Sequence, residues 1–216
     1  MKIDTFFFKT KTHKVLTWRG RVILLVALVL LCMLSWPLVR WSVTRYIYHV
    51  DDVQPTSRLV VENWDGSIQM FEGAHHVAGN LGAREMFSII FEDDYADVRK
   101  RHAYILNAWA VGIDTLHLTL IPVSKTEPKT LHIGQGVLEF AHQHQWQDLT
   151  VVTFDLHSAR SRKAYLLAAL PYNISVRFIG IPLEEIDHTN WTKNGTGLAM
   201  AFSELLKKLY YDLFVF

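Results

Sequence analysis

The residues with the clearest chemical potential lie in one short segment, residues 153–162, which reads Thr-Phe-Asp-Leu-His-Ser-Ala-Arg-Ser-Arg. An apolar run precedes this segment and an amphipathic stretch comes after it, so we expect a strand to end here and a helix to begin. His157 and Arg160 are three residues apart and would share one side of that helix. Arginine binds phosphate or carboxylate through paired hydrogen bonds, and the backbone N–H groups of a helix start favour the same ligands. The segment therefore predicts an anion site; the alternative is an ordinary helix start with exposed charges.

Further polar residues follow other apolar runs and are expected to approach the same place, because the carboxyl ends of parallel strands meet at the edge where ligands bind. Thr153 and Thr130 could donate hydrogen bonds to an anion, and Glu62 could order the opposite wall of the site. If the protein is an enzyme, His157 would act as acid or base, with Glu62 or Asp155 as its partner.

The sequence indicates no metal centre and no cofactor. Eleven histidines are present, but His142 and His144 are two apart on an expected helix and point away from each other. Cys32 is the only cysteine, and no HExxH pair occurs. The glycine fingerprint of dinucleotide-binding enzymes and the GxSxG turn of serine hydrolases are also absent from the sequence.

The chain beyond residue 57 alternates between short apolar runs and longer amphipathic stretches. The runs predict strands at 59–62, 87–91, 116–121, 149–154 and 175–179. The stretches predict helices at 69–79, 96–111, 128–144, 157–170 and 197–210. Strict alternation is typical of a parallel sheet covered by helices. We therefore expect an α/β fold, a Rossmann-like parallel sheet of about five strands with helices on both faces.

One apolar segment, residues 22–39, carries no charged residue and predicts a transmembrane helix about 27 Å long. A cleaved signal peptide has similar basic and apolar regions, but this segment is longer and ends in bulky Trp36 and Pro37. The expected parts are a basic cytoplasmic tail at 1–21, the transmembrane helix at 22–39, a juxtamembrane linker at 40–57 and one α/β domain at 58–216.

Charge is distributed unevenly along the chain. Up to Val50 there are eight Lys and Arg residues against one acid, and from Asp51 onward fourteen against twenty. Six of those eight precede the apolar segment, so the positive-inside rule places the tail in the cytoplasm. We expect a single-pass protein of a bacterial inner membrane, with the lipid bilayer as partner and the domain on the periplasmic side. An acidic domain is a poor binder of phosphate backbones, so no nucleic-acid partner is expected.

Several motifs of the domain match one family pattern. The fourth expected strand and its turn read VVT-x-x-x-H-x-x-R at 151–160, the first strand reads Val-Val-Glu-Asn-Trp at 60–64, and Lys129-Thr130 starts a helix. In these motifs, residues 58–211 resemble the YdcF/SanA/ElyC family of membrane-anchored envelope proteins. The resemblance implies a Rossmann-like domain with a role in envelope biogenesis, tied to cell-wall or lipid-carrier metabolism, and it implies no settled reaction.

The sequence leaves three hypotheses about function open. The first is an envelope-maintenance protein whose domain binds an anionic, phosphorylated or nucleotide-like ligand. The second is an enzyme that acts on a polyprenyl-phosphate or cell-wall glycan precursor. The third is a non-catalytic scaffold, because Asn63 stands where the family usually has a glycine that lets a ligand approach the backbone.

Overall fold

The computed structural model describes residues 8–9, 15–52, 54–64 and 66–215. The chain divides into two compact units, Met1–Ser42 and Val43–Phe216.

The first unit contains most of one long helix, α2 (Trp18–Ile47). Among the described residues it is the one helix long and apolar enough to cross a membrane, and its apolar side chains are exposed. Two short strands, β1 (Phe8–Lys9) and β2 (Val15–Leu16), pair antiparallel before it; the sequence did not predict them. Most of the expected basic tail, residues 1–7 and 10–14, lies outside the described residues.

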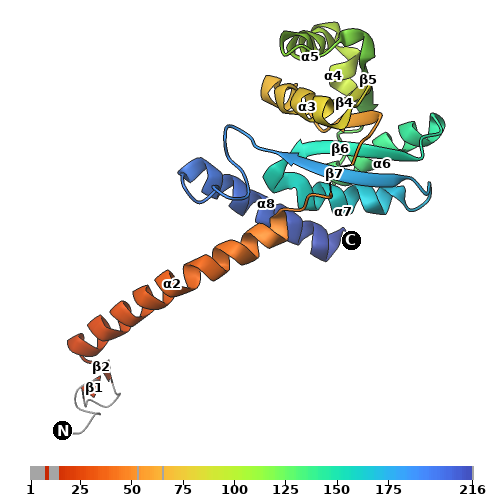
Figure 1. The fold of residues 1–216 in the computed structure, drawn as a ribbon. Helices are drawn as coiled ribbons and strands as arrows, with labels where there is room; N and C mark the ends of the chain where they lie inside the picture. The colour runs from red at the N-terminus through yellow and green to blue at the C-terminus, as the bar shows by residue number, and fades with distance from the viewer. Residues whose placement is uncertain (1–7, 10–14, 53, 65, 216) are drawn as a thin grey trace. The chain divides into compact units, whose positions relative to one another are not determined.

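The second unit is built on a parallel sheet of five strands in the order β5-β4-β3-β6-β7 (Figure 1). The strands are β3 (Arg58–Val61), β4 (Glu85–Phe91), β5 (Leu118–Val123), β6 (Asp148–Phe154) and β7 (Ser175–Ile181). Leu59, Val60 and Val61 of the central strand β3 are all fully buried, because helices cover both faces of the sheet. The expected α/β fold with a parallel sheet is confirmed.

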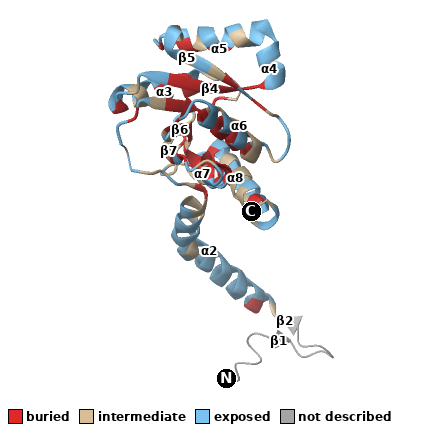
Figure 2. Cartoon of the chain, turned by 90° about the vertical axis from the view of Figure 1, so that its right-hand side faces the viewer, coloured by how far each residue is buried: buried red, intermediate tan, exposed pale blue. Residues whose placement is uncertain are grey.

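The helices divide between the two faces of the sheet. Those of the described chain in this unit are α3 (Ile68–Leu81), α4 (Glu92–Ala96), α5 (Val98–Ala110), α6 (Lys129–Gln143), α7 (Ser158–Ala169) and α8 (Gly195–Phe214). Side chains of α3 and α5 pack in one core cluster with Leu59 and Val61, and those of α6 and α7 pack in another with Val60. Successive residues of β3 thus point to opposite cores. Figure 2 shows the buried residues along the sheet and on the helix sides that face it.

Several expected boundaries differ from those of the structure, among them one boundary each of the linker, of a helix and of a strand. The linker expected at 40–57 is helical up to Ile47, because Ile47 is buried and continues the helix into a packed cluster. The helix expected at 96–111 begins at Val98, since the Asp97 side chain accepts a hydrogen bond from the Arg99 N–H at 2.8 Å and caps it. The strand expected from residue 116 begins at Leu118, after the 3-10 turn η1 (Thr115–His117).

A third cluster joins the last turn of α2 to α8 within the second unit. Its buried members are Ile47, Leu156, Ile186, Trp191 and Ala201. The indole N–H of Trp191 donates to Thr44 Oγ1 at 2.9 Å, and the Tyr46 hydroxyl donates to Asp212. Residues 43–47 therefore lie along α8 from Ala201 to Asp212.

Candidate functional site

The strand order has one switch point, between β3 and β6. β3 is the first strand of the sheet along the chain and β6 is the fourth, so the connections that leave them run to opposite sides. Open α/β sheets bind ligands in the crevice that forms there. Glu62 and Trp64 come after β3, and Asp155 and His157 belong to the 3-10 turn η2 (Asp155–His157) that comes after β6. The structure thus brings the predicted site residues of both strands to the switch point.

A cavity of about 570 Å³ lies beside these loops. It is lined by Trp64, Phe91, Glu127, Lys129, Thr130, Ile133, His157, Arg160, Leu206, Lys207, Tyr210 and Tyr211. Its volume is that of a site for a small molecule, and its mixture of aromatic walls and a few charged groups is also typical of one.

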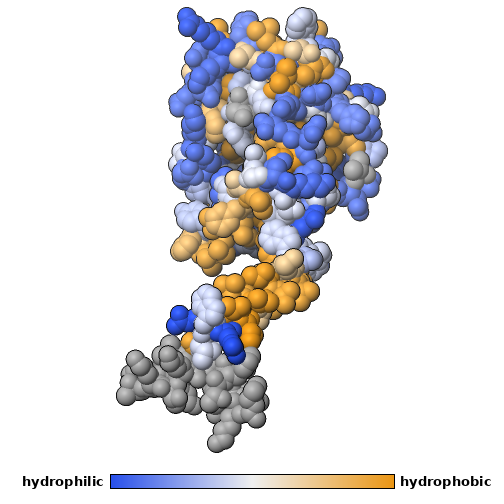
Figure 3. All heavy atoms as spheres, turned by 90° about the vertical axis from the view of Figure 1, so that its left-hand side faces the viewer, coloured by the Kyte–Doolittle hydropathy of each residue, from blue (hydrophilic) through white to orange (hydrophobic). Residues whose placement is uncertain are grey.

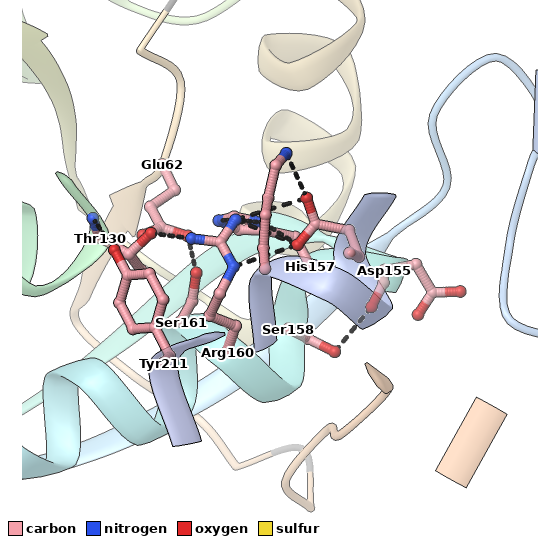
Figure 4. Close-up of polar contacts among 10 residues, drawn as sticks. Glu62, Thr130, Asp155, His157, Ser158, Arg160, Ser161 and Tyr211 are labelled. Atoms are coloured by element: carbon pink, nitrogen blue, oxygen red, sulfur yellow. Dashed lines mark hydrogen bonds and ion pairs between the residues drawn. The ribbon is translucent and has the colours of Figure 1, made fainter. Parts of the chain in front are cut away.

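Arg160 is buried in the cavity wall and is held by three elements (Figure 4). Its Nε and Nη2 donate to Glu204 Oε2 at 3.1 and 3.0 Å, and its Nη1 donates to the Thr130 hydroxyl. The guanidinium carbon lies 5.3 Å from the ring centre of Tyr211. Most of the five N–H donors of the guanidinium are therefore used inside the protein.

His157 shares the same carboxylate. Its Nδ1 lies 3.0 Å from Glu204 Oε2 and 2.7 Å from Arg160 Nη2. A proton on Nδ1 would be donated to Glu204, whereas an unprotonated Nδ1 would accept from Arg160. The ring also lies against Trp64, with ring centres 5.1 Å apart, so the position of the imidazole is fixed from two sides.

Glu204 is the anionic centre of this network. Burial alone would raise the pKa of Glu204, but the charge and hydrogen bond of His157, the charge of Arg160 and a hydrogen bond from Lys207 outweigh it. Together they hold the pKa of Glu204 well below its usual range. The carboxylate is therefore ionised at neutral pH and balances much of the charge of Arg160.

Glu62 and Thr153 are fully buried and do not belong to the cavity lining. Ser161 Oγ donates to Glu62 Oε2 at 2.7 Å. Within the part of the chain that the structure describes, Glu62 Oε1 and Thr153 Oγ1 have no hydrogen-bond partner. Burial and the charge of Glu62 raise the pKa of Tyr165. The two predicted ligand contacts thus lie in a polar layer outside the cavity, while Thr130, His157 and Arg160 line the cavity itself.

Asp155 is hydrogen-bonded to His188, whereas His157 is hydrogen-bonded to Glu204. Asp155 Oδ2 accepts a hydrogen bond from the His188 backbone N–H at 2.7 Å and lies 2.8 Å from His188 Nδ1. Asp155, His188 and Asp187 bring potential metal-ligand atoms within 4.8 Å of one another, a grouping that sequence spacing did not reveal. Asp187 Oδ1 also accepts from the backbone N–H groups of Thr189 and Asn190, at 2.7 and 2.9 Å. These internal hydrogen bonds account for the grouping without a metal ion.

Three of the site residues that sequence reasoning missed come from α8. Glu204, Lys207 and Tyr211 are spaced three and four residues apart and occupy one side of the helix. That spacing is a signal of a shared face, but only the tertiary structure shows that this face meets His157 and Arg160.

Asn63, which stands where the resembled family usually has a glycine, and Phe91 at the end of β4 both make local contacts through their side chains. Asn63 Oδ1 accepts from the Ser67 N–H at 2.8 Å, and its Nδ2 donates to the Ser67 carbonyl at 2.9 Å. The ammonium of Lys125 lies 4.9 Å from the centre of the Phe91 ring, which lines the cavity. The side chain of Phe91 thus lines the cavity together with residues of α6, α7 and α8.

No protein-family model matches the chain. No curated protein matches it either.

Proposed function

We propose that this chain is a single-pass protein of a bacterial inner membrane whose second unit binds a phosphorylated or otherwise anionic small ligand in the switch-point cavity. The domain would lie on the periplasmic side and serve the biogenesis or maintenance of the cell envelope. Membership of the YdcF/SanA/ElyC family is part of the proposal and rests on the resemblance of the motifs at 60–64, 129–130 and 151–160.

The anchoring of the chain is supported by α2 and by the packing of its C-terminal end. The helix is long enough to span a bilayer, and its apolar segment has no polar stripe. A secretory signal sequence would pass the same test of length and composition. However, Ile47 at the end of α2 is 1% exposed and belongs to the core cluster shared with α8. The folded unit therefore includes the end of this helix. Bulky Trp36 and Pro37 stand at the end of the apolar segment, where a cleavage site has small residues, and this favours a retained anchor over a cleaved one.

The observation that carries the proposed ligand class is the balance of charge in the cavity. Its lining contains Lys129, Arg160 and Lys207. Lys129 Nζ lies 3.2 Å from Glu127, while Arg160 and Lys207 share the single carboxylate of Glu204. Three cations thus face two carboxylates. An anion in the cavity would meet one excess positive charge between aromatic walls that lower the local dielectric.

The two lysines are the groups best placed to contact the ligand. Both lysine side chains are about half exposed, whereas the Arg160 side chain is 8% exposed and bound to Glu204. Arg160 would fix the wall and supply charge, and His157 would add a hydrogen bond. Losing one charge-assisted hydrogen bond, about 1.5–3 kcal/mol, weakens binding by about one to two orders of magnitude.

The test is a ligand screen on the full chain in detergent, using inorganic phosphate, pyrophosphate, nucleotides and sugar phosphates, with thermal stabilisation as the readout. We expect at least one compound to stabilise the parent protein in proportion to its concentration. Lys207→Gln should weaken that binding, and Lys193→Gln should not, because Lys193 is exposed in the loop before α8 and outside the cavity. Equal titrations of the two variants would contradict the proposed site. No stabilisation by any anion would favour a scaffold.

One observation favours an enzymatic function as a second candidate. His157 lines the cavity and is hydrogen-bonded to an ionised carboxylate that is only 13% exposed, which is how proteins position a catalytic imidazole. The partner is Glu204 and not Glu62 or Asp155. Incubation of the parent protein and His157→Gln with the best ligand of the screen separates the possibilities. Turnover by the parent alone would indicate an enzyme, whereas binding without turnover would indicate a binding protein.

A further inference from the structure

α8 carries a stripe of exposed apolar side chains along its length. The stripe consists of Leu198, Phe202, Leu206, Leu209 and Leu213, flanked near the C-terminus by Tyr210 and Phe214. Phe202 is 62% exposed, Leu213 64% and Phe214 75%. Spacings of three and four residues put these side chains on one side of the helix. Figure 3 shows apolar surface gathered in a patch at the lower edge of the folded unit.

Single exposed leucines need no explanation, but a continuous stripe on one helix does. The opposite side of α8 is already occupied: Gly197, Ala201 and Tyr211 are buried against the unit. The stripe is therefore separate from the side of α8 that packs in the core. It is a second apolar side on a helix whose first is packed.

The chain itself places α8 close to the expected bilayer. Residues 43–47 contact α8 from Ala201 to Asp212, through the third core cluster and the hydrogen bond of Tyr46 to Asp212. Val43 is only four residues beyond the end of the apolar segment at Val39. Four residues span at most about 14 Å even when fully extended. The covalent chain alone therefore keeps residues 43–47, and the part of α8 that they contact, near the surface of any membrane that the segment crosses.

We propose that the apolar stripe of α8 docks on the lipid bilayer, so that the domain is held at the membrane by a second contact besides its anchor. Helices with Phe and Leu on one side and charged residues on the other bind membrane interfaces in this way. α8 carries its charged residues Glu204, Lys207, Lys208 and Asp212 away from the stripe, where they form hydrogen bonds within the unit. Leu206 of the stripe and the flanking Tyr210 also line the cavity, so docking would bring the proposed ligand cavity to the lipid surface.

The test uses single-cysteine variants of the full chain in a Cys32→Ser background, since Cys32 is the only cysteine. Phe202→Cys and Leu213→Cys each receive an environment-sensitive fluorophore, and the protein is reconstituted in phosphatidylcholine vesicles that contain lipids spin-labelled near the headgroup. Leu116→Cys is the matched control, because Leu116 is an exposed leucine, 90% accessible, in η1 before the sheet edge strand β5.

We expect blue-shifted emission and quenching by the spin-labelled lipid at positions 202 and 213, and water-like, unquenched emission at 116. Water-like emission at all three positions would overturn docking. A blue shift at 202 and 213 without quenching by lipid would show that protein covers the stripe, as in a second copy of the chain, and would overturn it too.

This inference rests on the anchoring part of the proposed function, and the two failures can be told apart. Alkaline extraction of the same vesicles reports the anchor: release of the protein would refute anchoring and docking together. Retention with a water-like stripe would refute docking alone. Ligand binding in detergent does not depend on either result.

Discussion

Arg160 and Arg162 are two residues apart on α7, yet their environments differ. Arg160 is buried and bound to Glu204, whereas Arg162 is partly exposed and pairs with Asp51 at 3.2 Å. Removing one partner of a buried ion pair leaves an uncompensated charge, at a cost of about 3–5 kcal/mol, while an exposed pair contributes about 0–1 kcal/mol. His157 and Lys207 would still contact Glu204, so the cost at Arg160 should lie at the lower end.

We therefore expect Arg160→Ala to lower the free energy of unfolding by about 2–4 kcal/mol and Arg162→Ala by less than about 1 kcal/mol. Urea denaturation of the full chain in mild detergent, followed by near-UV circular dichroism, measures both. The sequence alone predicts a ligand-binding role for Arg160, and its hydrogen bonds to Glu204 and Thr130 add a structural role. Equal unfolding midpoints for the two variants would contradict the buried network.

Glu204 should make part of the stability depend on pH. Its pKa is lowered in the folded protein from an ordinary value of 4.5, so the native state resists protonation that the unfolded chain accepts. The stabilising contribution is complete above about pH 5 and is lost as the pH falls through the unfolded and then the folded pKa. Glu204→Gln lacks this contribution at every pH.

The measurable quantity is the difference in unfolding free energy between the parent and Glu204→Gln. We expect it to be large near pH 7 and to shrink towards about pH 3. Other acids, such as Asp212, whose pKa is also lowered, are common to both proteins and cancel in the difference. A difference that stays constant from neutral to acidic pH would show that Glu204 is not ionised in the network.

At the scale of elements, α6 and α7 approach each other closely at Gly134. A Cβ atom built on Gly134 would lie 3.2 Å from the Tyr165 ring and 3.3 Å from the Tyr165 Cα. The backbone of α7 cannot move away from an added methyl group as easily as a flexible side chain can. Gly134→Ala should therefore lower the free energy of unfolding by about 1–3 kcal/mol.

Gly79 in α3 is the matched control, because a Cβ there meets nothing within 4 Å. Alanine is the better helix former, so Gly79→Ala should raise the free energy of unfolding by about 0.5–1 kcal/mol. Thermal melts of the two variants should shift in opposite directions. A higher melting temperature for Gly134→Ala would contradict the close approach of α6 and α7 at this residue.

The elements were predictable from sequence where a local pattern decides them. The run at 59–61 is apolar on both faces, which is typical of a central parallel strand, and the five expected strands all occur. The predicted ends of helices were wrong where the true end depends on one side chain or on a contact distant in sequence. Examples are the capping side chain of Asp97 and the packing of Ile47 against α8. Of the site, His157 and Arg160 were found because they are three residues apart. Glu204 was not found, because 44 residues separate it from Arg160.

At the scale of the whole molecule, the proposal depends on which side of the membrane Val43–Phe216 occupies. Six Lys and Arg residues precede the apolar segment, while Arg40 and Arg45 come closely after it. Basic residues near a span are retained in the cytoplasm, and this bias sets orientation. An alkaline phosphatase fused after Phe216 should therefore be active, since that enzyme folds only after export, and a fluorescent protein that matures only in the cytoplasm should stay dark.

The same rule predicts how the orientation can be weakened. Replacing Lys9, Lys11 and Lys14 with Gln reduces the bias from six against two to three against two, so a measurable fraction of the fusion protein should invert and the phosphatase activity should fall relative to the amount of protein. The control replaces three lysines of the second unit, Lys193, Lys207 and Lys208, with Gln. It should leave the phosphatase activity unchanged, because these lysines lie far from the span in sequence. Phosphatase activity that is absent in the parent fusion, with fluorescence in its place, would put the domain in the cytoplasm. The envelope role would then have to be abandoned, although the cavity and its ligand class would stand.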